Sequence, residues 1–523
     1  MRKFAILVGL LTPFILGAAD FSGTWQMEST GGQNNGQVTT TRFYFKVSGD
    51  KFTGTRVVNV KNAAGEAWQD SVQDVANGTI SGDQITFDLL NWDHNARPTA
   101  YKGDLQNGEL TLELANPPQN ARGGGRGRGN FNVGPTVLKK VSAVSEFTMP
   151  ANLAHKTLPP IKPIPSNGLA QTPPMGWNSW NRFAARIDDK TMREIADAIV
   201  ASGMRDAGYV YLTIDDTWEG MRDANGVLQS NEKFPDMKAL ADYMHSKGLK
   251  LGIYSGPGMR TCQRLEASYG HEEIDAKTWA AWGIDYLKYD WCVSNGVYKP
   301  EEMPGAYQKM ALALRATGRP IVFSLCQYGW FDVGSWGANA GGNLWRTTGD
   351  ISDNWNSMAN IGFGQNGREK VAGPGHWNDP DMMEIGNGGM STTEYKTHFS
   401  LWAMLAAPLI AGHDVRTMND TIRSILTNRE VIAIDQDKTG HQGFRVRQDG
   451  DTEIWEKPLS DGVAVALFNR GGEGAKMSVK WSDIGVTKSN PKVHDVWSHQ
   501  DVDAPAGYTV EVPWHGAVLL TVK

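Results

Sequence analysis

The 523-residue sequence is poor in cysteine, has no excess of positive charge and lacks any apolar run long enough to span a bilayer. Its three cysteines show no CxxC spacing, so they support neither a zinc site nor a redox dithiol and leave room for one disulfide. Lys and Arg number 51 against 57 Asp and Glu, a net charge of −6, which argues against nucleic acid or an anionic membrane as a partner. Tryptophan, in contrast, is abundant at 19 residues and gives mild support to sugar binding.

The first residues have the composition of an export signal. Arg2 and Lys3 precede an apolar run over residues 4–16, and small residues at 17–19 offer a cleavage site. The run is too short for a permanent membrane span. We therefore expect residues 1–19 to be a signal peptide and the mature protein to be periplasmic or extracellular, with no membrane association beyond export.

The chain is too long for one compact core, and its patterning predicts several domains. Residues 20–147 carry short alternating runs separated by turn residues, for example 43–47 and 52–57 around Gly49. Such a pattern predicts an all-β barrel or sandwich. Its role is left open between sugar binding, lipid binding and a spacer or lid, with a plain structural domain as the default expectation. Five prolines predict an extended linker over residues 148–172.

The end of the chain turns β-rich again after a central region of different pattern. Alternating and apolar runs predict an antiparallel β-sandwich over residues 421–523. Asp435 and Asp437, at its start, are expected to be solvated turn residues.

The central region, residues 173–420, alternates strand-like and helix-like patterns eight times. Eight βα units over about 250 residues are the size and rhythm of a (β/α)₈ TIM barrel. Helical patterns lie between the strands, for example at 191–207, 237–247 and 393–405. The predicted strands are 175–180, 209–216, 250–256, 286–292, 321–327, 344–350, 375–382 and 408–415.

Acidic residues stand where five of the eight predicted strands end, on the rim that carries the active site of such barrels. One such Asp often caps the next helix, but capping alone does not explain five. A rim of carboxylates suits a metal site, a sugar-binding site or glycosidic hydrolysis. Neighbouring Lys288 and Arg346, with the aromatic residues, favour sugar chemistry, so we expect no metal and no cofactor. A cation beside Asp290 would keep it ionised as a nucleophile requires, whereas a proton donor needs a raised pKa.

Six motifs occur in order along this region: PMGWNSW at 174–180, IDD at 214–216, KLGIY at 250–254, LKYD at 287–290, WRTTGDI at 345–351 and WNDPDM at 377–382. With these motifs the sequence resembles glycoside hydrolase family twenty-seven, the family of α-galactosidases and α-N-acetylgalactosaminidases. The resemblance covers roughly residues 170–520 and does not extend to residues 20–147.

The resemblance implies a retaining exo-hydrolase that releases terminal α-D-galactose by double displacement. Asp290 would be the nucleophile and Asp350 the acid/base. Cys262 and Cys292 would form the family's disulfide, which leaves Cys326 free in the pocket wall. The implied substrate-binding residues are Trp177, Asp215, Asp216, Tyr254, Lys288, Cys326, Tyr328, Arg346 and Asp381. The partner is then a carbohydrate, and the sequence does not predict the oligomeric state.

One segment departs from the family pattern. Members often read Cys-Glu-Trp at the end of strand five, where this chain has Cys326, Gln327 and Tyr328. That segment helps to recognise the C2 substituent, and the larger side chains here weigh against α-N-acetylgalactosaminide cleavage. Two alternatives keep the mechanism, namely hydrolysis of β-L-arabinopyranosides and release of isomaltose. A non-catalytic carbohydrate-binding protein is a further alternative, which the intact Asp290 and Asp350 motifs disfavour.

Overall fold

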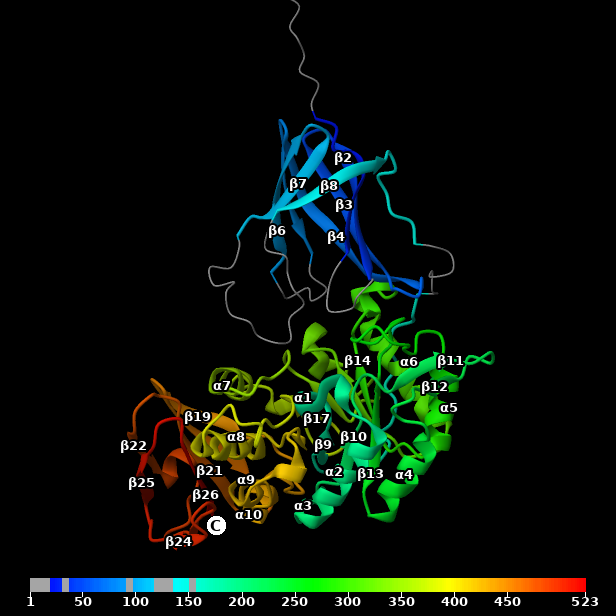
Figure 1. Ribbon diagram of the computed structural model, residues 1–523. Helices are drawn as coiled ribbons and strands as arrows, with labels where there is room; N and C mark the ends of the chain where they lie inside the picture. The colour runs from blue at the N-terminus through cyan, green and yellow to red at the C-terminus, as the bar shows by residue number, and fades with distance from the viewer. Residues whose placement is uncertain (1–18, 31–36, 91–96, 117–134, 150–156) are drawn as a thin grey trace, which may run out of the picture. The chain divides into compact units, whose positions relative to one another are not determined.

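The computed structural model describes residues 19–30, 37–90, 97–116, 135–149 and 157–523 (Figure 1). Apart from Ala19, the proposed signal peptide lies outside the described residues. By its internal contacts the chain divides into two compact units, residues 1–153 and residues 154–523. No helix among the described residues is both long and apolar enough to cross a membrane.

The first unit is a closed antiparallel barrel of eight strands, so of the two predicted β architectures the barrel is the one observed. Alternation along the strands places Phe43, Phe45, Phe52 and Phe87 in its buried core. A two-residue turn joins β6 to β7, where Asn107 and Gly108 both have positive φ, as a twisted hairpin of this length requires. The strands are β1 (Gly23–Thr30), β2 (Val38–Ser48), β3 (Lys51–Lys61), β4 (Ala67–Ser81), β5 (Gln84–Leu89), β6 (Thr99–Gln106), β7 (Glu109–Leu114) and β8 (Thr136–Ser142).

The second unit contains a TIM-barrel-like sheet of eight parallel strands in the order β17-β16-β15-β14-β13-β10-β9-β18. A parallel bridge between Met383 and Ala411 links the segment after β17 to β18, so the two ends of the sheet meet. All eight predicted strands are present, and each is shorter than predicted. They are β9 (Met175–Asn178), β10 (Tyr211–Thr213), β13 (Lys250–Ser255), β14 (Tyr286–Asp290), β15 (Val322–Cys326), β16 (Leu344–Arg346), β17 (Trp377–Asp379) and β18 (Leu409–Ala411).

Helices surround this sheet, as Figure 1 shows. They are α1 (Trp180–Phe183), α2 (Asp189–Ala201), α3 (Met204–Ala207), α4 (Met237–Ser246), α5 (Glu272–Trp282), α6 (Met303–Ala316), α7 (Trp355–Phe363), α8 (Thr392–Met404), α9 (Asp420–Leu426) and α10 (Arg429–Asp435). The helix predicted over 191–207 is broken in two, because Gly203 adopts a left-handed φ of 84° between α2 and α3. Side-chain caps begin several of the helices; Ser391, for example, forms a capping box with Glu394 at the start of α8.

The C-terminal strands form the predicted antiparallel sandwich beside α7 and α8 (Figure 1). One sheet has six strands in the order β19-β20-β21-β26-β23-β24, and β22 pairs with β25. The strands are β19 (Phe444–Asp449), β20 (Thr452–Pro458), β21 (Val463–Asn469), β22 (Ala475–Lys480), β23 (Val493–Asp495), β24 (Gln500–Val502), β25 (Gly507–Val512) and β26 (Ala517–Val522). A hairpin that the sequence did not predict, β11 (Glu219–Arg222) and β12 (Leu228–Ser230), follows β10.

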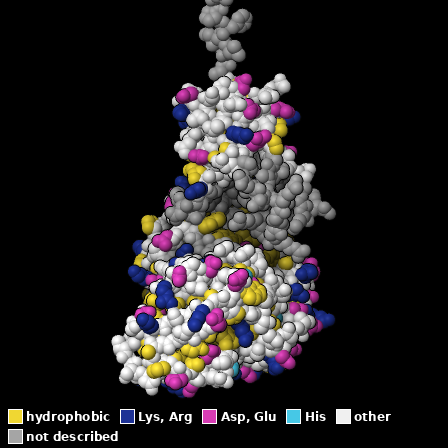
Figure 2. Space-filling view, turned by 90° about the vertical axis from the view of Figure 1, so that its left-hand side faces the viewer, with side chains coloured by type: hydrophobic (Ala, Val, Ile, Leu, Met, Phe, Trp, Pro, Cys, Tyr) yellow, Lys and Arg dark blue, Asp and Glu magenta, His cyan; other side chains and the backbone are white. Residues whose placement is uncertain are grey.

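One expectation for this region is wrong. Asp435 is the last residue of α10 and is fully buried, not a solvated turn residue. On the face of the molecule in Figure 2, basic and acidic side chains are interspersed and no extended field of one sign is visible.

Candidate active site

Strand β14 carries two of the predicted site residues on one face. Because side chains alternate along a strand, Lys288 and Asp290 point to the inside of the sheet. Leu287 and Tyr289 point outward, and the ring of Tyr289 packs against Tyr307 of α6. Leu287 and Tyr289 therefore pack the strand against its surroundings, while Lys288 and Asp290 face the centre of the sheet.

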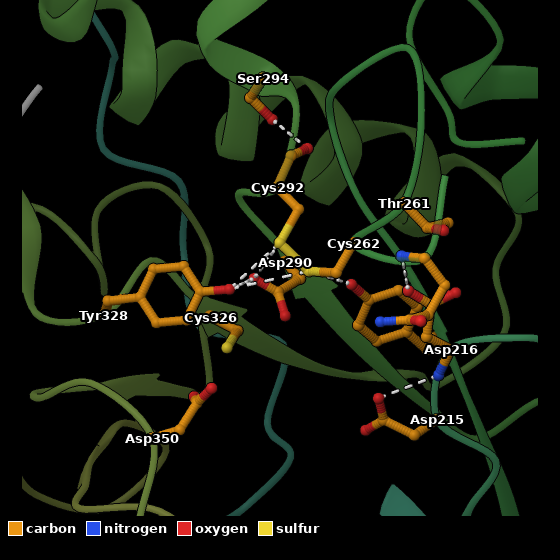
Figure 3. The surroundings of a disulfide bond; sticks show 12 residues. Asp215, Asp216, Thr261, Cys262, Asp290, Cys292, Ser294, Cys326, Tyr328 and Asp350 are labelled. Carbon is orange, nitrogen blue, oxygen red and sulfur yellow. Dashed lines mark hydrogen bonds between the residues drawn. A yellow bond between two sulfur atoms is a disulfide. The ribbon is translucent and has the colours of Figure 1, made fainter. Parts of the chain in front are cut away.

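Asp290 lies at the carboxyl end of β14 and is 5% exposed (Figure 3). Burial raises its pKa from 3.8 to about 6, although the positive charge of Lys288 and a hydrogen bond from Tyr328 act in the opposite direction. Tyr328 Oη donates to Asp290 Oδ1 over 2.5 Å. The carboxyl group is thus held by one oxygen and is ionised near neutral pH.

Asp215 and Asp216 lie just beyond β10 and are both buried. Asp215 Oδ2 accepts hydrogen bonds from Lys288 Nζ at 2.8 Å and from Asn178 Nδ2 at 2.7 Å. Asp216 Oδ2 accepts from the backbone N–H of Gln263 at 2.8 Å, whereas its Oδ1 has no partner among the described residues. Burial raises the pKa of Asp216 to about 7, and the negative charges of Asp215 and Asp290 add to that effect.

Arg346, at the end of β16, connects two further acids. Its Nη2 lies 2.8 Å from Asp381 Oδ2 and 3.1 Å from Asp350 Oδ1. Burial acts to lower the pKa of Arg346, but the carboxylates around it, Asp381 foremost, hold that pKa well above the ordinary value. The side chain of Asp350 is 60% exposed, in contrast to the buried Asp290.

The two acids beyond β16 and β17 are held by their loops as well. The backbone N–H of Ile351 donates to Asp381 Oδ2 at 2.9 Å, so the loop that presents Asp350 rests on Asp381. Asp381 itself has a φ of 91°, a left-handed conformation that is costly for a residue with a side chain. Asp379 Oδ1 stabilises this turn by accepting from the backbone N–H of Asp381 at 2.9 Å.

Cys262 and Cys292 form a disulfide beside Asp290, as the resemblance implied (Figure 3). Tyr254 Oη donates to Cys262 Sγ over 2.9 Å, so this phenol contacts the disulfide. Cys326 is a buried free thiol, and burial raises its pKa well above the ordinary value. It therefore remains a neutral thiol at neutral pH, with Arg346 Nη1 3.7 Å from its sulfur.

The side chains of Trp177 and Gln327 are completely buried and do not line an open pocket. Trp177 is completely buried and its indole N–H donates to the His413 carbonyl at 2.8 Å. Gln327 is likewise fully buried, and neither atom of its amide has a hydrogen-bond partner among the described residues.

Glu219 was not predicted from the sequence; it is a buried acid whose pKa is raised well above the ordinary value by burial and by the charge of Asp216. No periodic signal marked it, because it lies in the unpredicted hairpin.

The described residues contain one group of Cys, His and acidic side chains close enough to share a metal ion: Cys262, Asp290 and Cys292. Both sulfurs of that group are bonded to each other in the disulfide and are not thiolates. The group therefore lacks the donors of a metal site.

Together, these contacts place nine predicted residues around one end of the sheet: Asp215, Asp216, Tyr254, Lys288, Asp290, Cys326, Tyr328, Arg346 and Asp350, with Asp381 behind them. The ensemble offers a buried carboxylate, an exposed carboxyl group and fixed cations. Retaining glycoside hydrolysis uses two carboxyl groups, one as nucleophile and one as acid/base.

Comparison with known proteins gives consistent results. The family model described as alpha galactosidase A matches residues 172–437, and the model of the alpha galactosidase C-terminal beta sandwich domain matches residues 449–522. An alpha-galactosidase of Cyamopsis tetragonoloba is 50% identical over 350 residues, which cover 66% of this chain and 84% of that protein.

Solved structures extend the similarity. Alpha-galactosidase I from Mortierella vinacea superimposes with a TM-score of 0.65 at 38% identity, covering 68% of this chain and 98% of that one. A putative alpha-galactosidase/melibiase from Bacteroides fragilis has a TM-score of 0.65 at 32% identity and covers 96% of this chain and 98% of its own. The latter similarity therefore includes residues of the N-terminal barrel.

Proposed function

The chain belongs to the alpha-galactosidase family, and from that premise we propose that it removes terminal α-D-galactose by double displacement, with Asp290 as nucleophile and Asp350 as acid/base. Its similarity to known alpha-galactosidases identifies it as a glycoside hydrolase of that type. The residue roles rest on one observation, namely that a buried, cation-flanked carboxylate and an exposed carboxyl group meet at one end of the sheet.

In the first step, an oxygen of Asp290 bonds to the anomeric carbon while the glycosidic C–O bond breaks. The departing oxygen takes the proton of Asp350, which is exposed and so is reachable from the leaving-group side. The electron pair of the broken bond stays on the leaving oxygen, and the sugar remains covalently attached to Asp290. Lys288 and Tyr328 stabilise the negative charge of the free nucleophile before attack.

In the second step, Asp350, now a carboxylate, takes a proton from a water molecule as that water attacks the anomeric carbon. The bond to Asp290 breaks and its carboxylate is restored. Arg346 Nη2 donates to Asp350 Oδ1 over 3.1 Å and so fixes the direction of this carboxyl group. Two inversions at the anomeric carbon give net retention.

The remaining polar groups would hold sugar hydroxyls. Asp216 Oδ1 is buried without a partner among the described residues, which is costly unless water or a ligand hydroxyl binds it, so it suits a sugar hydroxyl. Asp215 and Lys288, already paired, would hold adjacent hydroxyls in fixed directions. Trp177 has no exposed surface, so its role as an apolar wall remains a prediction.

The experiment that tests the proposal is hydrolysis of a panel of p-nitrophenyl glycosides by the purified protein: α-galactoside, β-L-arabinopyranoside, α-N-acetylgalactosaminide and α-glucoside, with dextran as a polymer. We expect α-galactoside to be cleaved fastest. Preference for the arabinopyranoside or release of isomaltose would keep the mechanism and change the substrate. If the folded protein hydrolyses none of these substrates, the result would favour a protein that binds carbohydrate without catalysis.

Chemical rescue separates the two carboxyl groups. With azide, Asp290→Gly should yield the inverted β-galactosyl azide, because azide enters from the side that the nucleophile vacated. Asp350→Gly should yield the retained α-galactosyl azide through the intact covalent intermediate. The same product from both variants would contradict the assignment of roles.

Export is the remaining part of the proposal. The composition of residues 1–19 supports a signal peptide, and an oxidising compartment suits the Cys262–Cys292 disulfide. Amino-terminal sequencing of the protein recovered from periplasm or medium should begin near residue 20. Retention of the full amino terminus in the cytoplasm would contradict it.

A further inference from the structure

The phenol of Tyr328 is aimed at the nucleophile and not at open space (Figure 3). Its hydroxyl donates to Asp290 Oδ1 over 2.5 Å, a length typical of a strong hydrogen bond to a carboxylate. The same hydroxyl lies 3.3 Å from Cys292 Sγ, against the disulfide. The ring is flanked by Trp330, 5.5 Å away. These contacts fix the phenol on one oxygen of Asp290.

We propose that Tyr328 is the positioning residue of the nucleophile, because its hydroxyl holds Oδ1 of Asp290 and so selects Oδ2 as the oxygen that attacks the sugar. This inference rests on the proposed function. In the covalent intermediate, Oδ2 is bonded to the anomeric carbon and Oδ1 becomes a carbonyl oxygen. The Tyr328 hydroxyl can donate to Oδ1 in both states, so it need not move during the reaction.

The backbone of this segment is held in a costly conformation, which argues that the direction of the side chain matters. Tyr328 has a φ of 61° and is followed by Gly329 at 81°. A left-handed conformation is unusual for an aromatic residue and must be maintained by its surroundings. A Cβ on Gly329 would come within 2.2 Å of the Thr347 carbonyl oxygen, so only glycine fits the close approach of these two loops.

The hydroxyl is also a permanent donor. Burial raises the pKa of Tyr328 well above the ordinary value, and the negative charge of Asp290 raises it further. The phenol therefore keeps its proton at neutral pH, where Asp290 is ionised. The hydrogen bond favours the ionised form of Asp290, which is the form that attacks.

Charged and titratable groups from several other elements surround Asp290, and Tyr328 acts together with them. Lys288 on its own strand lowers its pKa, whereas nearby acids raise it. The groups that interact electrostatically with it are Lys288, Asp215, Asp216, Tyr254, Tyr307, Cys326, Tyr328 and Asp350. Of these, Tyr328 is the one whose hydrogen bond to Asp290 lowers the pKa of that carboxyl.

The test compares Tyr328→Phe with the wild type over the pH profile of kcat/KM for p-nitrophenyl α-galactoside. We expect kcat to fall by about 10- to 100-fold, since a hydrogen bond to a charged group is lost. The acid limb should move to higher pH by about one unit, because the carboxylate has lost a donor. Tyr254→Phe is the matched control: its phenol contacts Cys262 Sγ instead of Asp290, so the acid limb should stay in place whatever happens to its rate.

Two outcomes would overturn the inference. One is an unchanged acid limb in Tyr328→Phe, and the other is an effect on KM alone, which would make Tyr328 a substrate contact. A wild type without glycosidase activity would instead be a failure of the proposed function.

If the wild type has no glycosidase activity, the contact between Tyr328 and Asp290 can still be tested without substrate. A double-mutant cycle of Tyr328→Phe and Asp290→Ala on urea unfolding should show coupling near neutral pH. The coupling should shrink below about pH 4.5, where Asp290 is protonated in the folded wild type and in folded Tyr328→Phe. Equal coupling at both pH values would refute the inference.

Discussion

Replacing the nucleophile should make the protein more stable while it abolishes activity. In Asp290→Asn, the uncharged amide takes the place of a carboxylate that burial penalises. The Asn side-chain oxygen can still accept the hydrogen bond from Tyr328, and the side chains have nearly the same volume. The substitution therefore removes the cost of the buried charge with little other change.

The size of the effect follows from the pKa. The folded value of about 6 lies above the ordinary value of 3.8 expected for the unfolded chain. Between those values the folded state binds the extra proton, so stability falls as pH rises from about 4 to about 6 and stays low above that. At about pH 7.5 the penalty is about 3 kcal/mol, from roughly two pKa units at 1.36 kcal/mol each, and at about pH 4.5 it is about 1 kcal/mol.

The assay is urea and thermal unfolding of wild type and variant at these two pH values. Asp350→Asn is the matched control, because it also removes a catalytic carboxyl group but at a side chain that is 60% exposed. We expect a clear gain for Asp290→Asn at pH 7.5, a smaller gain at pH 4.5 and almost none for Asp350→Asn at either. A gain of the same size at both pH values, or a loss at pH 7.5, would refute the reasoning.

Three further predictions follow from the same contacts. The acid limb of kcat/KM should have its midpoint near pH 6 and fall tenfold per pH unit below it, as a pH–rate profile would show, because Asp290 must be ionised to attack; a limb near pH 4 would contradict the burial argument. Arg346→Met should cost about 3–5 kcal/mol in urea unfolding, since it leaves Asp381 buried without its cation; a neutral result would mean that water reaches Asp381. Replacing Cys262 and Cys292 together by Ser should cost about 3–4 kcal/mol, from the entropy of closing a loop with a sequence separation of 30, and dithiothreitol should bring the wild type to the same urea midpoint.

Much of the fold could be predicted because its signals are local. Most of the eight barrel strands carry mainly apolar residues, although β17 reads Trp-Asn-Asp, and all eight were located. Their lengths were overestimated, because the sequence continues smoothly into polar residues that belong to the loops. Asp350, for example, lies four residues beyond the end of β16. The residues just beyond the hydrogen-bonded ends of the strands are the ones that reach the site.

What could not be predicted depends on tertiary packing and backbone angles. The contact of Tyr328 with Asp290 requires a left-handed φ that no local pattern indicates for an aromatic residue. Asp435 was expected to be a solvated turn residue because it lies past the barrel, but it is the last residue of α10 and is fully buried. Glu219 was missed for a similar reason, since a buried carboxyl group in an unpredicted hairpin leaves no periodicity.

Aromatic side chains pack together in the core of the closed N-terminal barrel. Rings of Phe43, Phe45, Phe52 and Phe87 fill its inside, with centroids 4.9 to 5.9 Å apart in five contacts. An eight-stranded barrel is just wide enough for side chains to fill it, so a lipid could enter only by displacing these rings. Carriage of a hydrophobic molecule would therefore require this core to open, whereas recognition by the outer face of the strands would leave it intact.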